Sequence, residues 1–295
     1  MKKASILLLL AVLLTLQGCL MYNPFDSVTT TTSETTGTTT KDPDKEQPPV
    51  NIQHTYSSEW AKQLEGFLSS DGSLMYQLLM NKKVNQFGNE QYVPQNLLTL
   101  DQKTTLGGKY IELESRTARA LYAMFAEMAH DGITSARVTS GYRSYERQQE
   151  LYESYKLQEM QKISKEAYEY FGTEYIQNKY LLNNLYCLDR EDAEKVANYY
   201  SASPGTSEHQ TGLCVDLMTL SMTNLDNSFE KTDAFRWLSE NAHRFGFILR
   251  YPKGKTDITG YIYEPWHYRY VGRDAATEIY YRNITLEEYV LGEHA

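Results

Sequence analysis

The sequence has few cysteines and histidines, no excess of positive charge, and no apolar run that would comfortably span a membrane. Its 295 residues include three cysteines and six histidines, so at most one intramolecular disulfide can form. The 38 acidic side chains outnumber the 29 basic ones, and the resulting net charge of −9 argues against a broad nucleic-acid-binding surface. No internal repeat is visible. The strongly apolar run at residues 5–16 is too short for a comfortable transmembrane helix.

Apolar and aromatic content is nevertheless sufficient for a substantial core. Hydrophobic residues make up 41% of the chain and aromatic residues 13%, which at this length predicts one large domain with room for an appended subdomain. The 25 tyrosines are numerous. Because tyrosine joins an apolar ring to a polar tip, they suit a groove for a polar ligand, although a simple compositional bias would produce the same count.

The first residues have the order of a secretory signal. Lys2 and Lys3 precede the apolar run, and the run ends in LQGC, residues 16–19. This tetrapeptide resembles a bacterial lipobox, in which the cysteine becomes the lipid-modified first residue of the mature protein. We therefore predict a lipoprotein signal peptide over residues 1–18 and a lipid on Cys19. An uncleaved anchor and ordinary secretion are the alternatives.

A polar segment follows the signal. Residues 27–49, SVTTTTSETTGTTTKDPDKEQPP, contain almost nothing that a core could bury, which predicts a disordered tether. We assign residues 19–54 to this tether and residues 55–295 to the folded domain. A lipid anchor with such a tether would hold the domain at the outer face of the cell membrane and let it reach away from that surface.

The remainder of the chain mixes helical and strand-like segments. Residues 115–130 carry apolar side chains at helical spacing, and LCVDLMTL (213–220) has the apolar content of a buried strand. One or two short helices are expected at 58–80, and other helices at 145–170, 232–245 and at 273–282 or 285–291. Residues 136–144 are expected to form a strand that runs into a loop, and further strands are expected at 245–252 and 261–271. Because strict βαβ alternation is absent, we predict an α+β domain, with a small, mostly antiparallel central sheet flanked by helices.

An aspartate inside the apolar run at 213–220 requires a partner. A buried carboxylate is costly unless it is paired or bound to a metal, and no Lys or Arg lies in the run around Asp216. A distant cationic side chain is one solution. The other is zinc, which accepts two histidine nitrogens and one carboxylate oxygen and leaves a position for water. His209 and His267 would complete such a site, although a lone histidine is more often structural.

Three further residues bear on this chemistry. His209 lies seven positions before Asp216, so the two side chains would leave opposite faces of a straight strand, and Gly212 permits the bend that brings them together. Glu264 is a candidate general base for a water molecule, or else a surface glutamate at a strand end. Arg143 could clamp a carboxylate through two hydrogen bonds, or lie exposed on a turn.

Three motifs occur in order along the chain: SGYRSYERQ (140–148), SPGTSEHQTGLCVDL (203–217) and EPWHYRYVG (264–272). Weaker matches are LMNKKVNQFGNEQYVP (79–94) and TLEEYV (285–290). Together they resemble the VanY-type D-alanyl-D-alanine carboxypeptidases, zinc peptidases of the bacterial cell wall, over roughly residues 75–291. Cys214 departs from the family pattern, in which a small alanine is usual, and residues 150–200 are less recognisable.

The resemblance implies a small α+β domain whose fold is shared with the hedgehog signalling domain, and the removal of a C-terminal D-alanine from a peptidoglycan stem peptide. In the resemblance, Arg143 holds the terminal carboxylate or the developing oxyanion. The implied residues are the zinc ligands His209, Asp216 and His267, the catalytic base Glu264, and the substrate contacts Arg143, Gln148 and Ser207.

Several alternatives stay open at this point. The same zinc centre could serve an L,D-carboxypeptidase, a D-Ala-D-Ala dipeptidase or cleavage of an internal bond, because the motifs describe the metal site and not the rest of the groove. A non-catalytic wall-binding domain is disfavoured, since Glu264 and all three ligands are present. Cys187 and Cys214 could pair in an oxidising compartment, or Cys214 could be a small buried residue.

Overall fold

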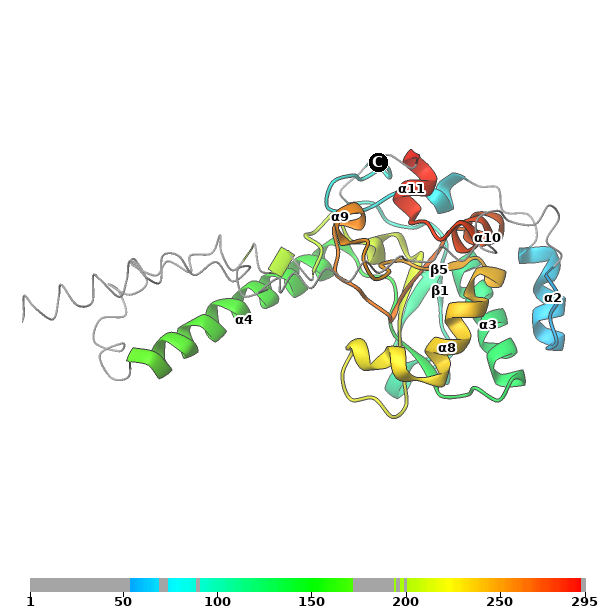
Figure 1. Cartoon of the computed structure of the whole chain (residues 1–295), viewed down its shortest axis with the longest axis horizontal. Coiled ribbons are helices and arrows are strands. Elements are labelled where there is room, and N and C mark those ends of the chain that lie inside the picture. Colours follow the sequence, from blue (N-terminus) through cyan, green and yellow to red (C-terminus); the bar gives the residue numbers. More distant parts are fainter. Residues whose placement is uncertain are drawn as a thin grey trace, which may run out of the picture. The chain divides into compact units, whose positions relative to one another are not determined.

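A four-stranded antiparallel sheet in the order β3–β4–β6–β5 lies at the centre of the fold (Figure 1). The computed structural model describes residues 54–68, 74–88, 91–171, 194, 197, 198 and 201–292. The strands are β3 (Ala136–Ser140), β4 (Cys214–Thr219), β5 (Phe247–Leu249) and β6 (His267–Tyr270). A second antiparallel sheet pairs β1 (Leu97–Thr99) with β2 (Glu112–Glu114). The predicted α+β class is confirmed.

Alternation along the strands gives the central sheet two faces of different character. One face sends apolar side chains into the main core: Val215, Leu217, Phe247, Tyr268 and Tyr270. The intervening positions of β4 and β6 place ionisable side chains on the opposite face, and these are buried too: Cys214, Asp216, His267 and Arg269. In the register, Asp216 lies directly opposite His267, and Cys214 lies opposite Arg269. We call this second side the polar face of the sheet.

Helix α3 (Ser115–His130) contributes a long apolar stripe to the main core. The Glu114 carboxylate accepts the backbone N–H groups of Arg116 and Thr117 and so caps its start. Of the predicted apolar face, four side chains are buried and Phe125 packs partly buried against the core; the four are Ala120, Leu121, Met124 and Met128. Helix α2 (Glu59–Leu68) contacts α3, and α8 (Asp233–Asn241) with the 3-10 helix η6 (Ala242–Phe245) extends the same core.

A smaller apolar cluster joins the C-terminal helices α10 (Arg273–Arg282) and α11 (Leu286–Leu291) to Leu79 and Ile248. Thr285 caps α11 in a capping box with Glu288, which fixes where this helix begins. The remaining elements are α4 (Tyr145–Phe171), α9 (Thr256–Thr259), and the 3-10 helices η2 (Leu74–Gln77), η3 (Leu106–Gly108), η4 (Glu208–Thr211) and η5 (Asn227–Lys231).

Most predicted elements are present, with two differences. The strand expected over 261–271 is confined to His267–Tyr270, because residues 261–266 form a loop in which Pro265 has no N–H for strand pairing. The helix expected at 273–282 or 285–291 is in fact two helices, since both segments are helical. The helices predicted from residues 115 and 145 and the strand predicted from residue 136 begin where they were expected.

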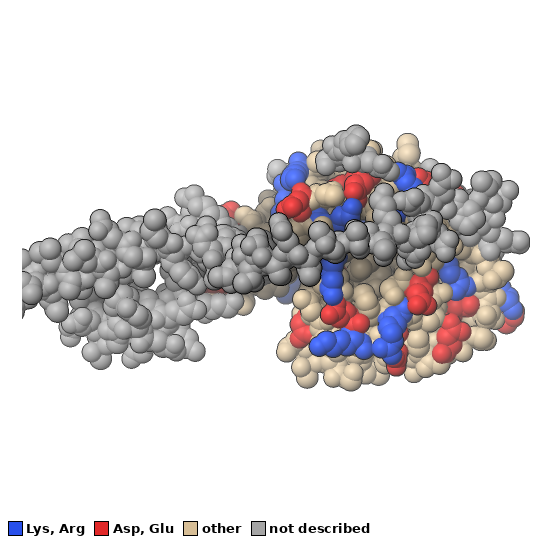
Figure 2. All heavy atoms as spheres, in the orientation of Figure 1, with Lys and Arg blue, Asp and Glu red and all other residues tan. Residues whose placement is uncertain are grey.

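The predicted signal peptide, the lipidated Cys19 and nearly all of the tether lie outside the described residues, as does Cys187. Within the described part of the chain, no helix combines the length and apolarity that a membrane crossing needs. Acidic and basic side chains are interspersed over the face drawn in Figure 2, without a large area of one sign.

Candidate metal centre and substrate pocket

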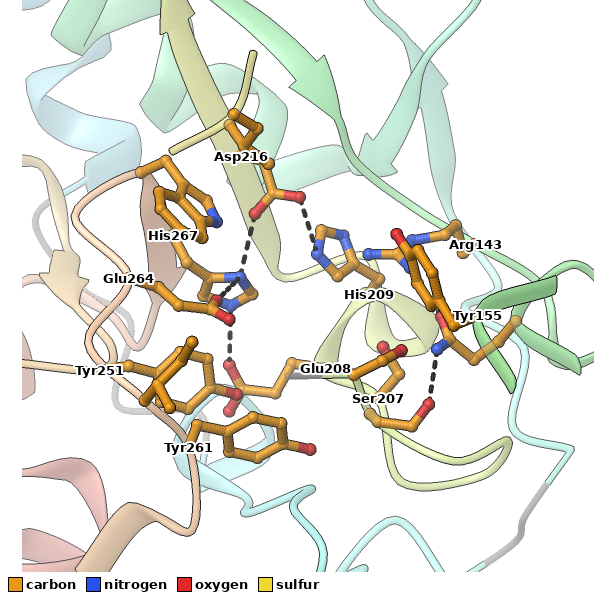
Figure 3. Close-up of a pocket in the computed structure, with 16 residues that line it drawn as sticks. Arg143, Tyr155, Ser207, Glu208, His209, Asp216, Tyr251, Tyr261, Glu264 and His267 are labelled. Carbon is orange, nitrogen blue, oxygen red and sulfur yellow. Dashed lines mark hydrogen bonds and ion pairs between the residues drawn. The ribbon is translucent and has the colours of Figure 1, made fainter. Parts of the chain in front are cut away.

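A pocket opens over the polar face of the sheet, where β4, β6, η4 and the start of α4 meet the loop before β6 (Figure 3). Every side chain predicted from the sequence for metal binding, catalysis or substrate contact lines this pocket: Arg143, Gln148, Ser207, His209, Asp216, Glu264 and His267. The chain thus brings together three motifs that are spread over residues 140–272 of the sequence.

Asp216 lies between the two histidines (Figure 3). Its Oδ2 atom is 3.2 Å from His209 Nε2, and its Oδ1 atom is 3.0 Å from His267 Nδ1. All three side chains are buried, with residue exposures of 5% or less. Two imidazole nitrogens and one carboxylate therefore converge on one point, although they come from a 3-10 helix and two strands.

The outer nitrogens of the two rings indicate which atoms are free to bind a cation. His209 Nδ1 is 2.7 Å from the Gly141 carbonyl oxygen, which can only accept, so Nδ1 carries the proton. His267 Nε2 lies 3.4 Å from the Glu208 carboxylate, which likewise accepts. The neutral rings therefore turn two bare nitrogens toward Asp216, and three acceptors meet. Only additional protons or a metal ion between them relieves that repulsion, and this donor set is one that divalent metals use at catalytic sites.

The charge of Asp216 is strongly favoured. Burial alone would raise the pKa of its carboxyl group, but His209 and His267 in their protonated forms supply positive charge and hydrogen bonds that hold that pKa well below its usual range. An ionised carboxylate at this depth accounts for the aspartate in the apolar strand. Its partners are the two histidines and the cation that they imply.

Two glycines shape the backbone around His209. Gly212 ends η4 with a left-handed φ of 69°, and a Cβ atom there would lie 2.9 Å from the backbone nitrogen of Glu114. This confirms the predicted bend, with His209 before it and Asp216 on β4 after it. At Gly141, a Cβ atom would lie 2.6 Å from the Glu112 carbonyl oxygen. The absence of a side chain lets this segment approach closely enough to hold the His209 ring.

Glu264 lies at the pocket wall beside the histidines. Its Oε2 atom is 3.8 Å from His267 Nδ1, and the residue is 8% exposed. Burial, and secondarily the charge of Asp216, raises the pKa of Glu264 to about 7, against the opposing effects of the histidines and Arg143. A carboxyl group with a pKa near 7 can accept and return a proton at neutral pH, which is the property required of a general base.

Arg143 presents a partly unsatisfied guanidinium group to the pocket. Its Nη1 donates to Gln148 Oε1 at 2.7 Å, and Gln148 Nε2 in turn donates to the Ala202 carbonyl oxygen at 2.7 Å. The Arg143 backbone N–H donates to the His209 carbonyl oxygen at 3.0 Å. Among the described residues, the buried Nε of Arg143 has no hydrogen-bond partner. A ligand carboxylate would satisfy it, and Ser207, which is 3% exposed, lines the same pocket.

Tyrosines form much of the remaining wall. Tyr155, Tyr251 and Tyr261 line the pocket (Figure 3). The rings of Tyr251 and Tyr261 stack with centroids 4.5 Å apart, and the Tyr251 ring lies 4.9 Å from that of His267. This placement agrees with the expectation that some of the 25 tyrosines serve a groove for a polar ligand.

Sequence reasoning missed Glu208, which lies between two predicted site residues and turns away from them into the interior. Its Oε1 accepts from Arg250 Nε and from Arg269 Nη1, both at 2.7 Å. Burial alone would raise the pKa of Glu208, but these two arginines and His267 lower it well below its usual range. Glu208 is therefore a buried anion that faces the outer nitrogen of His267 and holds its orientation.

The same network reaches the C-terminal helix. Arg250 donates from Nη1 and Nη2 to the two carboxylate oxygens of Glu287 in α11, at 2.8 and 2.6 Å, and Asn81 Nδ2 donates to the same carboxylate at 2.9 Å. Arg250 and Arg269 are fully buried. The sequence did contain a sign of these ion pairs, because an arginine in an apolar segment requires a buried anion, just as Asp216 requires a cation. We call Glu208, Arg250, Arg269 and Glu287 the buried charge network.

Comparison with known proteins agrees with this geometry. Residues 110–273 match the family model of VanY, D-alanyl-D-alanine carboxypeptidase. The putative carboxypeptidase YodJ of Bacillus subtilis (strain 168) is 35% identical over 287 residues, which span 92% of this chain and 89% of YodJ.

Two solved structures are similar over most of the folded part. One is the vancomycin-resistance D,D-pentapeptidase VanY of a VanB-type cassette, described in complex with Zn(II), with 34% identity and a TM-score of 0.52 over 73% of this chain and 99% of that chain. The other is the LdcB LD-carboxypeptidase, with 33% identity and a TM-score of 0.54 over 69% of this chain and 81% of that chain.

Proposed function

The chain belongs to the VanY family of D-alanyl-D-alanine carboxypeptidases, and on that basis we propose that it is a zinc-dependent D,D-carboxypeptidase acting on peptidoglycan stem peptides. The observation that carries the proposal is the convergence of His209 Nε2, His267 Nδ1 and the Asp216 carboxylate on one point beside Glu264. A structural metal site would need no buried base next to it, and a wall-binding module would need no metal-binding set.

The three converging side chains are the proposed zinc ligands: His209, Asp216 and His267. When bound, zinc supplies Lewis-acid chemistry, lowering the pKa of a water molecule toward about 7 and polarising a carbonyl group. The related VanY structure in complex with Zn(II) supports zinc over other divalent ions. The donor set also fits, because zinc accepts both imidazole nitrogen and carboxylate oxygen as ligands.

The remaining residues act on the substrate and on the proton. Arg143, supported by Gln148, is placed to bind the terminal carboxylate of the substrate, and Ser207 offers a hydroxyl in the same pocket. Glu264 takes a proton from the attacking water and delivers it to the nitrogen of the departing D-alanine as the peptide C–N bond breaks. The products are the shortened peptide with a new carboxyl group and free D-alanine.

The decisive experiment measures D-alanine release from stem peptides. Purified protein should release D-alanine from a pentapeptide ending in D-Ala-D-Ala, lose this activity to a chelator, and regain it on zinc addition. A tetrapeptide ending in a single D-alanine, in which the bond cleaved is L,D, should be the poorer substrate. Preference for the tetrapeptide would identify an L,D-carboxypeptidase with the same centre, and release of D-alanine from neither would overturn the proposal.

We also propose that the protein is a lipoprotein at the outer face of the cell membrane. The support is the LQGC sequence at residues 16–19 and the polar segment after it. Cys19→Ala should move the protein from the membrane fraction to a soluble or unprocessed form, and mass spectrometry of the wild-type N-terminus should find a lipid on Cys19. An unmodified cysteine, or a mature chain that begins elsewhere, would refute this assignment.

A further inference from the structure

A cysteine lies inside the metal centre without a role in the proposed reaction. Cys214 and Asp216 are two positions apart on β4, so both side chains leave the polar face of the sheet. Cys214 is fully buried. Its thiol lies within hydrogen-bonding reach of the imidazoles of both His209 and His267.

The ligand atoms of these residues form a compact group. One nitrogen from each histidine and the Cys214 sulfur all lie within 4.8 Å of one another. The nitrogens left free on the two histidines are Nε2 of His209 and Nδ1 of His267, the same atoms that face Asp216. The two rings therefore lie close to two further donor groups on the same strand, the carboxylate of Asp216 and the thiol of Cys214.

On the basis of the proposed zinc site, we propose that Cys214 is an additional metal ligand, so that the protein supplies two imidazoles, one carboxylate and one thiolate. The water molecule of the proposed reaction would then take a fifth position, a coordination number that catalytic zinc can reach. Metal binding displaces the thiol proton to solvent and forms a metal–sulfur bond, with no oxidant or reductant involved. Cysteine sulfur is a common zinc ligand, with bonds of about 2.3 Å. The added thiolate would bind zinc more tightly and favour soft metal ions over hard ones.

The competing explanation is that Cys214 is a buried thiol that only fills space. The two explanations predict different metal-binding behaviour. A thiol that only fills space affects the fold but leaves metal preference alone. A thiolate ligand affects each metal according to its affinity for sulfur, so its removal should weaken Cd²⁺ binding more than Zn²⁺ binding. It should also give a bound Co²⁺ ion a thiolate-to-cobalt charge-transfer absorption in the near ultraviolet.

The test uses the full-length protein in detergent, prepared metal-free and anaerobically, with Cys214→Ala and Cys214→Ser as variants. Both variants leave Cys19 and Cys187 in place, so a difference from wild type belongs to Cys214. Alanine removes the sulfur, while serine keeps a polar atom of similar size that is a poor zinc ligand. Circular dichroism of each metal-free variant establishes that it is folded.

We expect Co²⁺ to produce the charge-transfer band in wild type and in neither variant. Competition with a chromophoric chelator should show Zn²⁺ affinity falling by at least about tenfold in both variants, since even outer partners of a ligand contribute 10- to 100-fold. Cd²⁺ affinity should fall further. The wild-type spectrum also decides one outcome without a variant, because wild type that binds Co²⁺ without this band refutes the proposal even if a variant fails to fold.

Failure of this inference can be told apart from failure of the proposed function. If wild type binds Co²⁺ and Zn²⁺ but shows no thiolate band, and both variants keep the wild-type affinities, Cys214 is not a ligand and the carboxypeptidase proposal is unaffected. If wild type binds neither metal, the proposed zinc centre itself is wrong, and the inference falls with it.

Discussion

Replacing Arg250 with methionine should destabilise the folded protein severely and weaken its metal site. Arg250 is fully buried and makes three hydrogen bonds to two carboxylates, one to Glu208 and two to Glu287. Methionine has similar length and no charge. After the replacement Glu208 still has Arg269, but among the described residues Glu287 keeps only the hydrogen bond from Asn81 as a polar partner from another segment.

The expected magnitude follows from the charge left behind. Removing one partner of a buried ion pair costs about 3–5 kcal/mol, because the other charge stays buried without compensation. Replacing Glu287 with leucine in the same chain removes that orphaned charge, so the double variant should recover part of the loss. Total stabilities of about 5–15 kcal/mol are typical, which means that the single variant forfeits a large fraction.

The assay is urea unfolding at neutral pH with a chelator present, because bound metal would otherwise add to the measured stability. With a slope of about 3 kcal/mol per molar urea, the midpoint should fall by about 1 M or more. Arg147→Met is the matched control: Arg147 pairs with Glu150 at 2.7 Å, but both side chains are more than 60% exposed, so its loss should stay within about 0.5 kcal/mol. A loss below 1 kcal/mol for Arg250→Met would refute the argument that the network holds the fold.

Three further predictions concern catalysis. Glu264→Gln should keep bound zinc but lower kcat by about 10²- to 10⁴-fold; loss of zinc instead would make Glu264 a ligand. Because the pKa of Glu264 is raised to about 7 and only its ionised form accepts a proton, kcat/KM should rise with pH through about 7 and level off above; a flat profile from pH 5 to 8 would contradict this role. Arg143→Lys should lower kcat/KM by about 10- to 150-fold, the loss of a charged hydrogen bond, yet affect a C-terminally amidated peptide little; equal losses on both peptides would argue against carboxylate binding.

The local sequence pattern was sufficient to predict those helices and strands whose own residues indicate their structure. Helix α3 occupies the predicted residues 115–130, because its apolar spacing and the glycine at its end are both local features. Strand β4 was recognisable from its continuous apolar content around Asp216. The loop before β6 was not, because Tyr261, Ile262 and Tyr263 have strand propensity and only tertiary packing holds them in a pocket wall.

Some residues of the site could likewise be predicted from the sequence, and others could not. His209, Asp216 and His267 were predicted together because an acid in an apolar strand requires a cation, and all three line one pocket. Glu208 was missed although it is adjacent to His209. Its partners Arg250 and Arg269 are 42 and 61 residues away, so nothing local distinguishes it from an ordinary loop glutamate. Which charged residues pair in the interior depends on how the strands assemble. The spacing of residues along the chain does not reveal this.

The buried charge network also sets the smallest fragment of the chain that should fold with its metal centre intact. The family match covers residues 110–273, yet Glu287 lies beyond its end and Asn81 before its start, and the two meet at Arg250 behind the metal centre. A chain trimmed to the matched region would carry every ligand and the base. It would nevertheless leave Arg250 and Arg269 to share the carboxylate of Glu208 without that of Glu287, and it would remove the carbonyl oxygens of Tyr76 and Leu78 that accept from Arg269. Expression and domain-swapping work should therefore retain residues 74–292 as one piece.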